Sequence, residues 1–140
     1  MEKPIITGKT IKIPSDQNYL ADVDVFVEEL LRGFGVGESV IADIAISVSE
    51  IVNNAIVHGN RAITAQPVEV SVNRENGTVA ITIRDCGSGF DPETVENPID
   101  DGNLMKEVGR GIFIVRSLMD DVVIKPSSDG TVVTIKKAIA

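Results

Sequence analysis

The chain has 140 residues, 43% of them hydrophobic, which is enough to bury one core and too few for two ordinary domains. Its 21 acidic and 13 basic residues give a formal net charge of −8, which argues against broad contact with nucleic-acid phosphates or an anionic membrane. The single cysteine, Cys86, cannot form an internal disulfide, and no Cys/His cluster has zinc-site spacing. We expect one domain over residues 1–140, without direct nucleic-acid contact.

The N-terminus carries no apolar signal-peptide region, and no apolar run comes near the roughly 18 residues that a membrane span requires. The sequence therefore predicts a cytoplasmic protein that is not embedded in a membrane.

The first half of the chain is patterned for one strand and two helices. Residues 5–13 alternate apolar and polar side chains, which predicts a strand. From residue 20 apolar residues recur on one helix face until the glycines of 33–37. A second helix is expected over 38–58 and stops at Gly59. This helix is apolar on most sides, so we expect it to be buried and its few polar residues to be informative.

The second half is patterned mainly for strands, with one helix. Residues 86–108 show no sustained period, and a loop of that length inside a compact domain is uncommon unless it is functional, for example as a lid over a ligand. The expected elements are strands at 68–73 and 78–84, a helix at 109–119, and strands at 121–125 and 131–137.

Short turns between paired strands predict antiparallel pairing, and the helices must cover one face of the resulting sheet. The expected fold class is α+β: a two-layer α/β sandwich with a mostly antiparallel mixed sheet and helices packed on one face.

A first polar cluster lies on the second expected helix. Glu50 and Asn54 are four residues apart and so share one face, and Ser47 and His58 extend the same strip. Burying a carboxylate and a carboxamide costs free energy unless a partner satisfies them, and a magnesium ion with its waters is such a partner. Capping of nearby backbone, or simple exposure to solvent, explains the same residues equally well.

A second cluster, residues 85–90, directly follows a strand. Asp85 can present a carboxylate to the amino group of a base, and Gly87 and Gly89 let a flat ring approach the backbone. Aspartate with two glycines is also ordinary turn chemistry.

The third cluster is Gly109-Arg110-Gly111, at the expected start of a helix. Free backbone N–H groups and the positive end of the helix dipole favour phosphate at such a position. An ordinary loop-to-helix junction has the same composition. The chain contains neither a Rossmann glycine turn nor a Walker-type phosphate loop.

The order of these clusters resembles the ATP-binding superfamily of gyrase and histidine kinases, the Bergerat fold. Nearly the whole chain follows this order: first a helix with Glu-x-x-x-Asn, then a strand followed by Asp-x-Gly-x-Gly, then a flexible segment, and then a Gly-x-Gly. Within the superfamily, the string from Ser49 to Gly59 and the Gly-Arg-Gly-Ile form of the third cluster are most similar to bacterial anti-sigma factor serine kinases.

The resemblance implies a role for each matching residue. Asn54 would ligate magnesium on the phosphates of ATP, and Glu50 would be the general base toward a serine of a partner protein. Asp85 would accept the adenine amino group, while Gly87 and Gly89 would shape the base pocket.

Gly109, Arg110 and Gly111 would lie along the phosphates under a lid at about 86–108, and Thr131 would sit near the adenine. One departure concerns the arginine that some relatives carry shortly before the Gly-x-Gly, because the matching stretch here reads Lys106-Glu107-Val108. A missing cation would weaken stabilisation of the transferred phosphoryl group.

The function implied is an ATP-binding anti-sigma regulatory factor that sequesters a sigma factor and phosphorylates a serine on a small anti-anti-sigma antagonist. A homodimer is also implied, with the first strand as the edge for pairing. The alternatives are a non-catalytic ATP-binding partner-switch module and a detached histidine-kinase catalytic domain.

Overall fold

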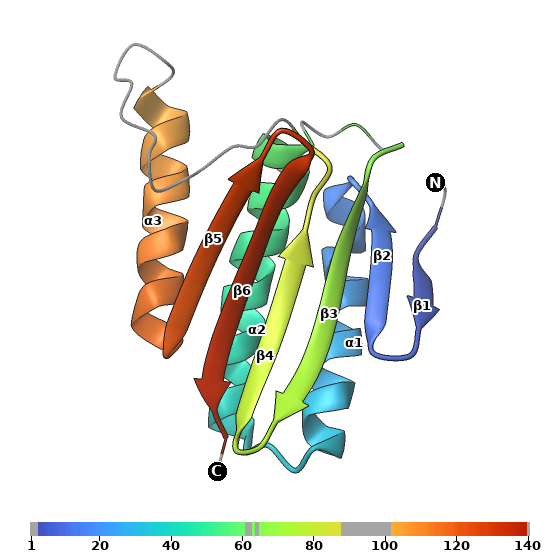
Figure 1. Cartoon of the computed structure of the whole chain (residues 1–140), viewed down its shortest axis with the longest axis vertical. Helices are drawn as coiled ribbons and strands as arrows, with labels where there is room; N and C mark the ends of the chain where they lie inside the picture. The colour runs from blue at the N-terminus through green and yellow to red at the C-terminus, as the bar shows by residue number, and fades with distance from the viewer. Residues whose placement is uncertain (1–2, 61–62, 64, 88–101, 140) are drawn as a thin grey trace.

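A computed structural model describes residues 3–60, 63, 65–87 and 102–139, without the side chains of 102–108. Within this part of the chain, a six-stranded sheet runs in the order β1-β2-β3-β4-β6-β5, and every neighbouring pair is antiparallel. The helices cover one face of the sheet: α1 lies behind β2 and β3, α2 behind β4 and β6, and α3 beside β5 (Figure 1). The predicted α+β sandwich is confirmed.

The elements are β1 (Ile5–Thr7), β2 (Thr10–Pro14), the 3₁₀ turn η1 (Gln17–Tyr19), α1 (Leu20–Gly33), α2 (Glu38–Asn54), the π-helical turn η2 (Ala55–Gly59), β3 (Pro67–Glu75), β4 (Thr78–Arg84), α3 (Gly102–Leu118), β5 (Asp121–Ser127) and β6 (Gly130–Ala138).

The single strand expected over residues 5–13 is instead a hairpin, so that prediction was wrong. β1 and β2 pair with Thr7 opposite Thr10, and Gly8 takes a φ of +60°, the left-handed conformation that a two-residue hairpin loop needs. Because this turn is so short, the apolar alternation continues across it almost unbroken, and the sequence pattern therefore does not reveal the turn. Ile11 is buried in the core, whereas Ile6 on the edge strand β1 is 60% exposed.

The core lies between the sheet and the helices, as one cluster of buried side chains. α2 is central because it packs against α1 on one side and α3 on the other while facing β4. Full burial of one aliphatic side chain contributes about 1.5–3 kcal/mol, so a cluster of this size accounts for most of the stabilisation of the fold. Its fully buried members include Ile13, Val27, Leu31, Ile44, Val48, Ile56, Val70, Val72, Ile81 and Ile135.

The helical segment Glu38–Gly59, which comprises α2 and η2, is by length and composition apolar enough to cross a membrane, contrary to the sequence expectation. That expectation considered uninterrupted apolar runs, whereas this segment carries a few polar residues inside an otherwise apolar helix. A core helix satisfies the same criterion, and this one packs between its neighbouring helices and the sheet. It is therefore weak support for a membrane span.

The third helix begins at Gly102, well before the expected start at Gly109. Part of the expected lid, 102–108, is therefore helical backbone, while 88–101 lies outside the described residues. The sequence interpretation took the glycines as a helix boundary, but a glycine inside a helix costs only about 1 kcal/mol, which packing against α2 can offset. Gly109 and Gly111 are consequently interior residues of α3.

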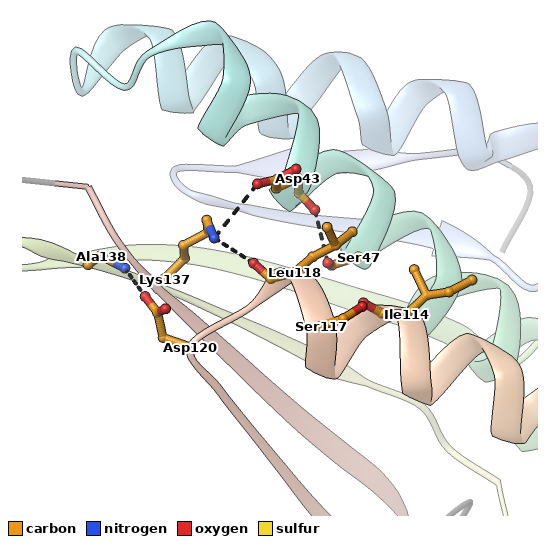
Figure 2. A network of polar contacts seen from close by, with 8 residues as sticks. All are labelled: Asp43, Ser47, Ile114, Ser117, Leu118, Asp120, Lys137 and Ala138. Atoms are coloured by element: carbon orange, nitrogen blue, oxygen red, sulfur yellow. Dashed lines mark hydrogen bonds and ion pairs between the residues drawn. The ribbon is translucent and has the colours of Figure 1, made fainter.

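A polar network holds the end of α3 against α2 and β6 (Figure 2). The Nζ atom of Lys137 donates to the carbonyl oxygen of Leu118 at 2.5 Å and lies 3.7 Å from Oδ2 of Asp43. Next to it, Oδ2 of Asp120 accepts from the backbone N–H of Ala138 at 2.6 Å. A cation at the C-terminus of a helix is favourable because the last carbonyl groups lack partners within the helix. This network fixes the C-terminal end of α3 against α2 and β6.

Candidate functional site

Asp85 lies just past the end of β4 and is almost completely buried, with 7% exposure. Its Oδ1 atom accepts hydrogen bonds from the backbone N–H groups of Gly87 and Thr131, each at 3.0 Å. The backbone N–H of Asp85 in turn donates to the carbonyl oxygen of Thr131 at 3.0 Å. These contacts tie the carboxylate to the start of β6 through one oxygen.

The second oxygen of Asp85 faces Gly59, at the end of η2. A Cβ atom on Gly59 would collide with Oδ2, so only glycine permits this approach. Burial raises the pKa of the Asp85 carboxyl, and the two N–H donors to Oδ1 offset part of that rise. A ligand that donates a hydrogen bond to Oδ2 would relieve the remaining cost of burying the charge.

Gly87 packs directly on Gly59. A Cβ atom on Gly87 would collide with the carbonyl oxygen of Gly59, so the loop after β4 and the end of η2 approach each other backbone to backbone. The sequence predicts that Gly87 lets a base approach the backbone. The structure adds that the packing against Gly59 also requires a glycine at this position. Gly89, the other glycine of that motif, lies outside the described residues.

Glu50 and Asn54 lie on the face of α2 that meets Gly111 of α3. A Cβ atom on Gly111 would come within 2.8 Å of Oε2 of Glu50 and 3.7 Å of Nδ2 of Asn54. The first and third sequence clusters are therefore neighbours. Gly109 and Arg110, by contrast, are exposed on α3.

The Nδ2 atom of Asn54 is buried, and no hydrogen-bond partner for it exists in the described part of the chain. Leaving such a group unsatisfied costs about 1–3 kcal/mol, so a partner outside the protein is favoured. Rotation of the amide by half a turn exchanges nitrogen and oxygen, so this position can present an amide oxygen to a hard cation. The residue fits the magnesium role that the resemblance implies.

Two members of the expected polar strip lie in different surroundings. Ser47 is fully buried, and its hydroxyl donates to the carbonyl oxygen of Asp43 at 2.9 Å, a bond within the helix itself. His58 lies in the π-helical turn η2, beyond the regular α-helix that ends at Asn54. The strip that the α-helical spacing predicts is therefore reduced to Glu50 and Asn54.

The expected position of Gly109-Arg110-Gly111 at a helix N-terminus was wrong. These residues lie inside α3, where backbone N–H groups are engaged in the hydrogen bonds of the helix. The free donors that the sequence analysis assigned to phosphate binding are therefore absent at this point of the described backbone.

Asn60, directly after Gly59, is a buried polar residue that no motif in the sequence marks as part of the site. It is 1% exposed and bridges the end of η2, the start of β3 and the loop after β4 through four hydrogen bonds. Two of its partners, Ser15 and Cys86, are 45 and 26 residues away in the sequence, so no local pattern could have identified it.

One pocket collects several of these residues, and we call it the site pocket. Its polar lining comes from Asn54, Asp85 and Thr131, while apolar side chains form the rest, with Ile112 contributed by α3. The cavity measures about 20 Å³, which is room for one water molecule. Among the described residues no group of three or more His, Cys, Asp or Glu side chains is arranged to hold a metal ion. The lining residues are Ile51, Asn54, Ala55, Gly59, Ile83, Asp85, Ile112, Thr131 and Val133.

Comparison with known proteins identifies the family of this chain. The family model "Histidine kinase-like ATPase domain" matches residues 13–137. An anti-sigma F factor of Geobacillus kaustophilus is 36% identical over 103 residues, covering 71% of this chain and 70% of the relative. The serine-protein kinase RsbW of Listeria innocua is 25% identical over 119 residues, covering 81% of this chain and 76% of the relative.

Two solved structures share the fold. The RsbU and RsbW domains of a Mycobacterium tuberculosis protein match 99% of this chain with a TM-score of 0.70 at 21% identity. A blue-light activated histidine kinase of Erythrobacter litoralis matches 74% of this chain with a TM-score of 0.58 at 26% identity. This chain covers 32% of each of those two longer chains. The chain belongs to the histidine kinase-like ATPase domain family, and within it is similar to a bacterial anti-sigma F factor and to bacterial serine-protein kinases.

Proposed function

We propose that this chain is an ATP-binding anti-sigma regulatory factor, which sequesters a sigma factor and phosphorylates a serine on a small antagonist protein. The observation that carries the proposal is the convergence of Asp85 and Asn54 on one pocket. Asp85 contributes a buried carboxylate whose Oδ2 faces Gly59, and Asn54 contributes a buried amide nitrogen that has no hydrogen-bond partner among the described residues. The names of the relatives, anti-sigma F factor and serine-protein kinase, support the same role.

The adenine ring would enter the site pocket with its amino group toward Oδ2 of Asp85. The apolar lining, including Ile83 and Val133, offers the faces of the pocket to a flat base, and Thr131 lies beside Asp85. Because the cavity holds only about one water, entry of a base requires the lining to give way. Ile112 is the lining residue contributed by α3, so we expect α3 to shift when nucleotide binds.

The phosphates and magnesium would lie toward Asn54, whose amide oxygen would be a metal ligand. Magnesium, when bound, neutralises charge on the transferred phosphoryl group. Glu50, one helical turn before Asn54, would take the proton from the attacking serine hydroxyl. Because Gly111 has no side chain, there is room for the Glu50 carboxylate between α2 and α3.

The sigma factor and the antagonist are the proposed partners, and the proposed location is the cytoplasm, with residues 1–140 as a single domain. A homodimer is proposed through the β1 edge. Ile5 and Ile6 are 53% and 60% exposed there, and Val25 of α1 is 54% exposed. A groove of about 310 Å³ runs between β1 and α1, with Phe26 and Ile11 among its lining residues.

A non-catalytic ATP-binding switch is the second candidate. It is favoured by one observation: the stretch before the Gly-x-Gly reads Lys106-Glu107-Val108, where some relatives carry an arginine, and a missing cation would weaken stabilisation of the transferred phosphoryl group. Such a module would bind nucleotide and regulate its partner without phosphoryl transfer.

Calorimetry with ATP and magnesium tests the binding proposal. We expect heat of binding from the natural chain and its loss in Asn54→Ala and in Asp85→Asn. Intact binding in both variants would contradict the assignment of the pocket.

Transfer of labelled phosphate to a serine-bearing antagonist then separates the two candidates. Glu50→Gln should retain ATP binding and lose transfer by about 100-fold or more, the usual contribution of a general base. Binding by the natural chain without any transfer would favour the switch.

A further inference from the structure

Asn60 links three parts of the fold beside the proposed nucleotide site. Its side chain is 1% exposed, and it follows Gly59, the residue that faces Asp85. Its own backbone N–H donates to the carbonyl oxygen of Ala55 at 2.8 Å and closes the π-helical turn η2. The backbone of Asn60 is therefore fixed independently of its side-chain contacts.

The two ends of the Asn60 amide have different kinds of partner. The Nδ2 atom donates to Oγ of Ser15 at 2.8 Å and to the carbonyl oxygens of Gln66 and Pro67 at 3.2 and 3.1 Å. The Oδ1 atom accepts from the backbone N–H of Cys86 at 2.8 Å. A half-turn of the amide would point oxygen at two carbonyl oxygens, so this pattern fixes its orientation.

The hydrogen bond to Cys86 acts on the residue next to Asp85. Asp85 has its own contacts through Oδ1, to Gly87 and Thr131. Asn60 adds an independent tether, which ties the backbone just after Asp85 to Ser15, the residue after β2, and to the start of β3. With the backbone fixed on both sides, the Asp85 carboxylate keeps Oδ1 on its N–H donors and Oδ2 toward Gly59.

We propose that Asn60 is a positioning residue for base recognition: it orients the Asp85 carboxylate so that the site selects a purine with an amino group at the ring position that Oδ2 faces. This inference rests on the proposed ATP site and adds a residue that sets its base selectivity. Asn60 touches no reacting group and acts through the Cys86 backbone.

The test compares two nucleotides that differ only in that amino group, ATP and purine riboside triphosphate. A hydrogen bond to a charged acceptor corresponds to a preference of about tenfold or more for ATP in the natural chain. Asn60→Ala frees the Cys86 N–H, and we expect the preference to fall to within about threefold. Faster hydrogen exchange at the Cys86 amide in the nucleotide-free chain should accompany this loss.

Loss of stability alone does not change a ratio of affinities between two ligands of one site. Ile44→Val, a core change remote from Asp85 in the sequence, serves as the destabilised control and should keep the natural preference. If Asn60→Ala does not fold, Ser15→Ala removes one anchor of Nδ2 and should lower the preference by at least about twofold.

A natural preference retained in folded Asn60→Ala, or in Ser15→Ala where Asn60→Ala does not fold, would overturn the inference while leaving the ATP site intact. Failure of the natural chain to bind ATP at all would instead overturn the proposed function.

Discussion

Two glycines of α3 give a matched pair of substitutions that tests where this helix begins. Gly109 and Gly111 both lie inside α3, so alanine at either position should gain about 0.8–1 kcal/mol of helix propensity. A Cβ atom on Gly109 meets no atom of the described residues within 4 Å, so Gly109→Ala should keep the full gain. For a chain of 140 residues this corresponds to a rise in Tm of about 3–4 °C.

Gly111→Ala has the same propensity gain but meets the Glu50 carboxylate, because its Cβ would lie 2.8 Å from Oε2. The end of a flexible side chain can move, and an off-rotamer side chain costs about 0.5–1.5 kcal/mol, so we expect almost no net change in stability. The displaced Glu50 should lower phosphoryl transfer by about tenfold or more. The two variants thus separate stability from activity.

Thermal unfolding of both variants by circular dichroism, with the natural chain in parallel, measures the effect. A lower Tm for Gly109→Ala would show that residue 109 is not inside a helix and would refute the start of α3 at Gly102. Equal stabilisation by both alanines would refute the contact between Gly111 and Glu50.

Three further substitutions have expected outcomes. Burial raises the pKa of Asp85, so its ionisation costs folding free energy, and the protein loses stability as pH rises from the ordinary pKa of 3.8 through the folded pKa. At pH values above that range, Asp85→Asn should raise the Tm, and it should weaken ATP binding about 10–100-fold. A lower Tm of this variant at neutral pH would contradict the reasoning. Lys137→Met should lower the free energy of unfolding by about 1 kcal/mol in urea, whereas the neighbouring Lys136→Met should leave it within about 0.5 kcal/mol. Ile81→Ala, at a fully buried position of β4, should lower the free energy of unfolding by about 2–5 kcal/mol in the same assay. A smaller loss would show that the neighbouring core side chains move into the space that Ile81 leaves.

Local pattern was sufficient for most of the elements. α1 runs from Leu20 to Gly33, and β4 from Thr78 to Arg84, where the periodicity places them, because each buries a continuous face that repeats in the sequence. The pattern failed where a turn does not interrupt it, as at Gly8, and where glycine lies inside a helix, as at Gly109. At Gly109 packing against α2 outweighs the local preference, whereas at Gly8 the turn is too short to interrupt the apolar alternation.

The candidate site was predictable only through the order of its motifs. Taken alone, Asp85 and Asn54 had equally good explanations as turn and cap residues, and their convergence on one pocket is a tertiary fact. Asn60 could not be identified, since its side-chain partners Ser15 and Cys86 are 45 and 26 residues away. A buried side chain that joins distant loops leaves no periodic trace in the sequence.

The π-helical turn η2 limits how this part of the chain can change in length. Its five residues, Ala55–Gly59, form one wide turn between Asn54 and the glycine that meets Asp85. Removing one residue would restore an ordinary helix and rotate everything after it by about 100°, the angle of one helical residue. Gly59 would then no longer face the carboxylate, so insertions and deletions are excluded here even where a change of side chain is harmless.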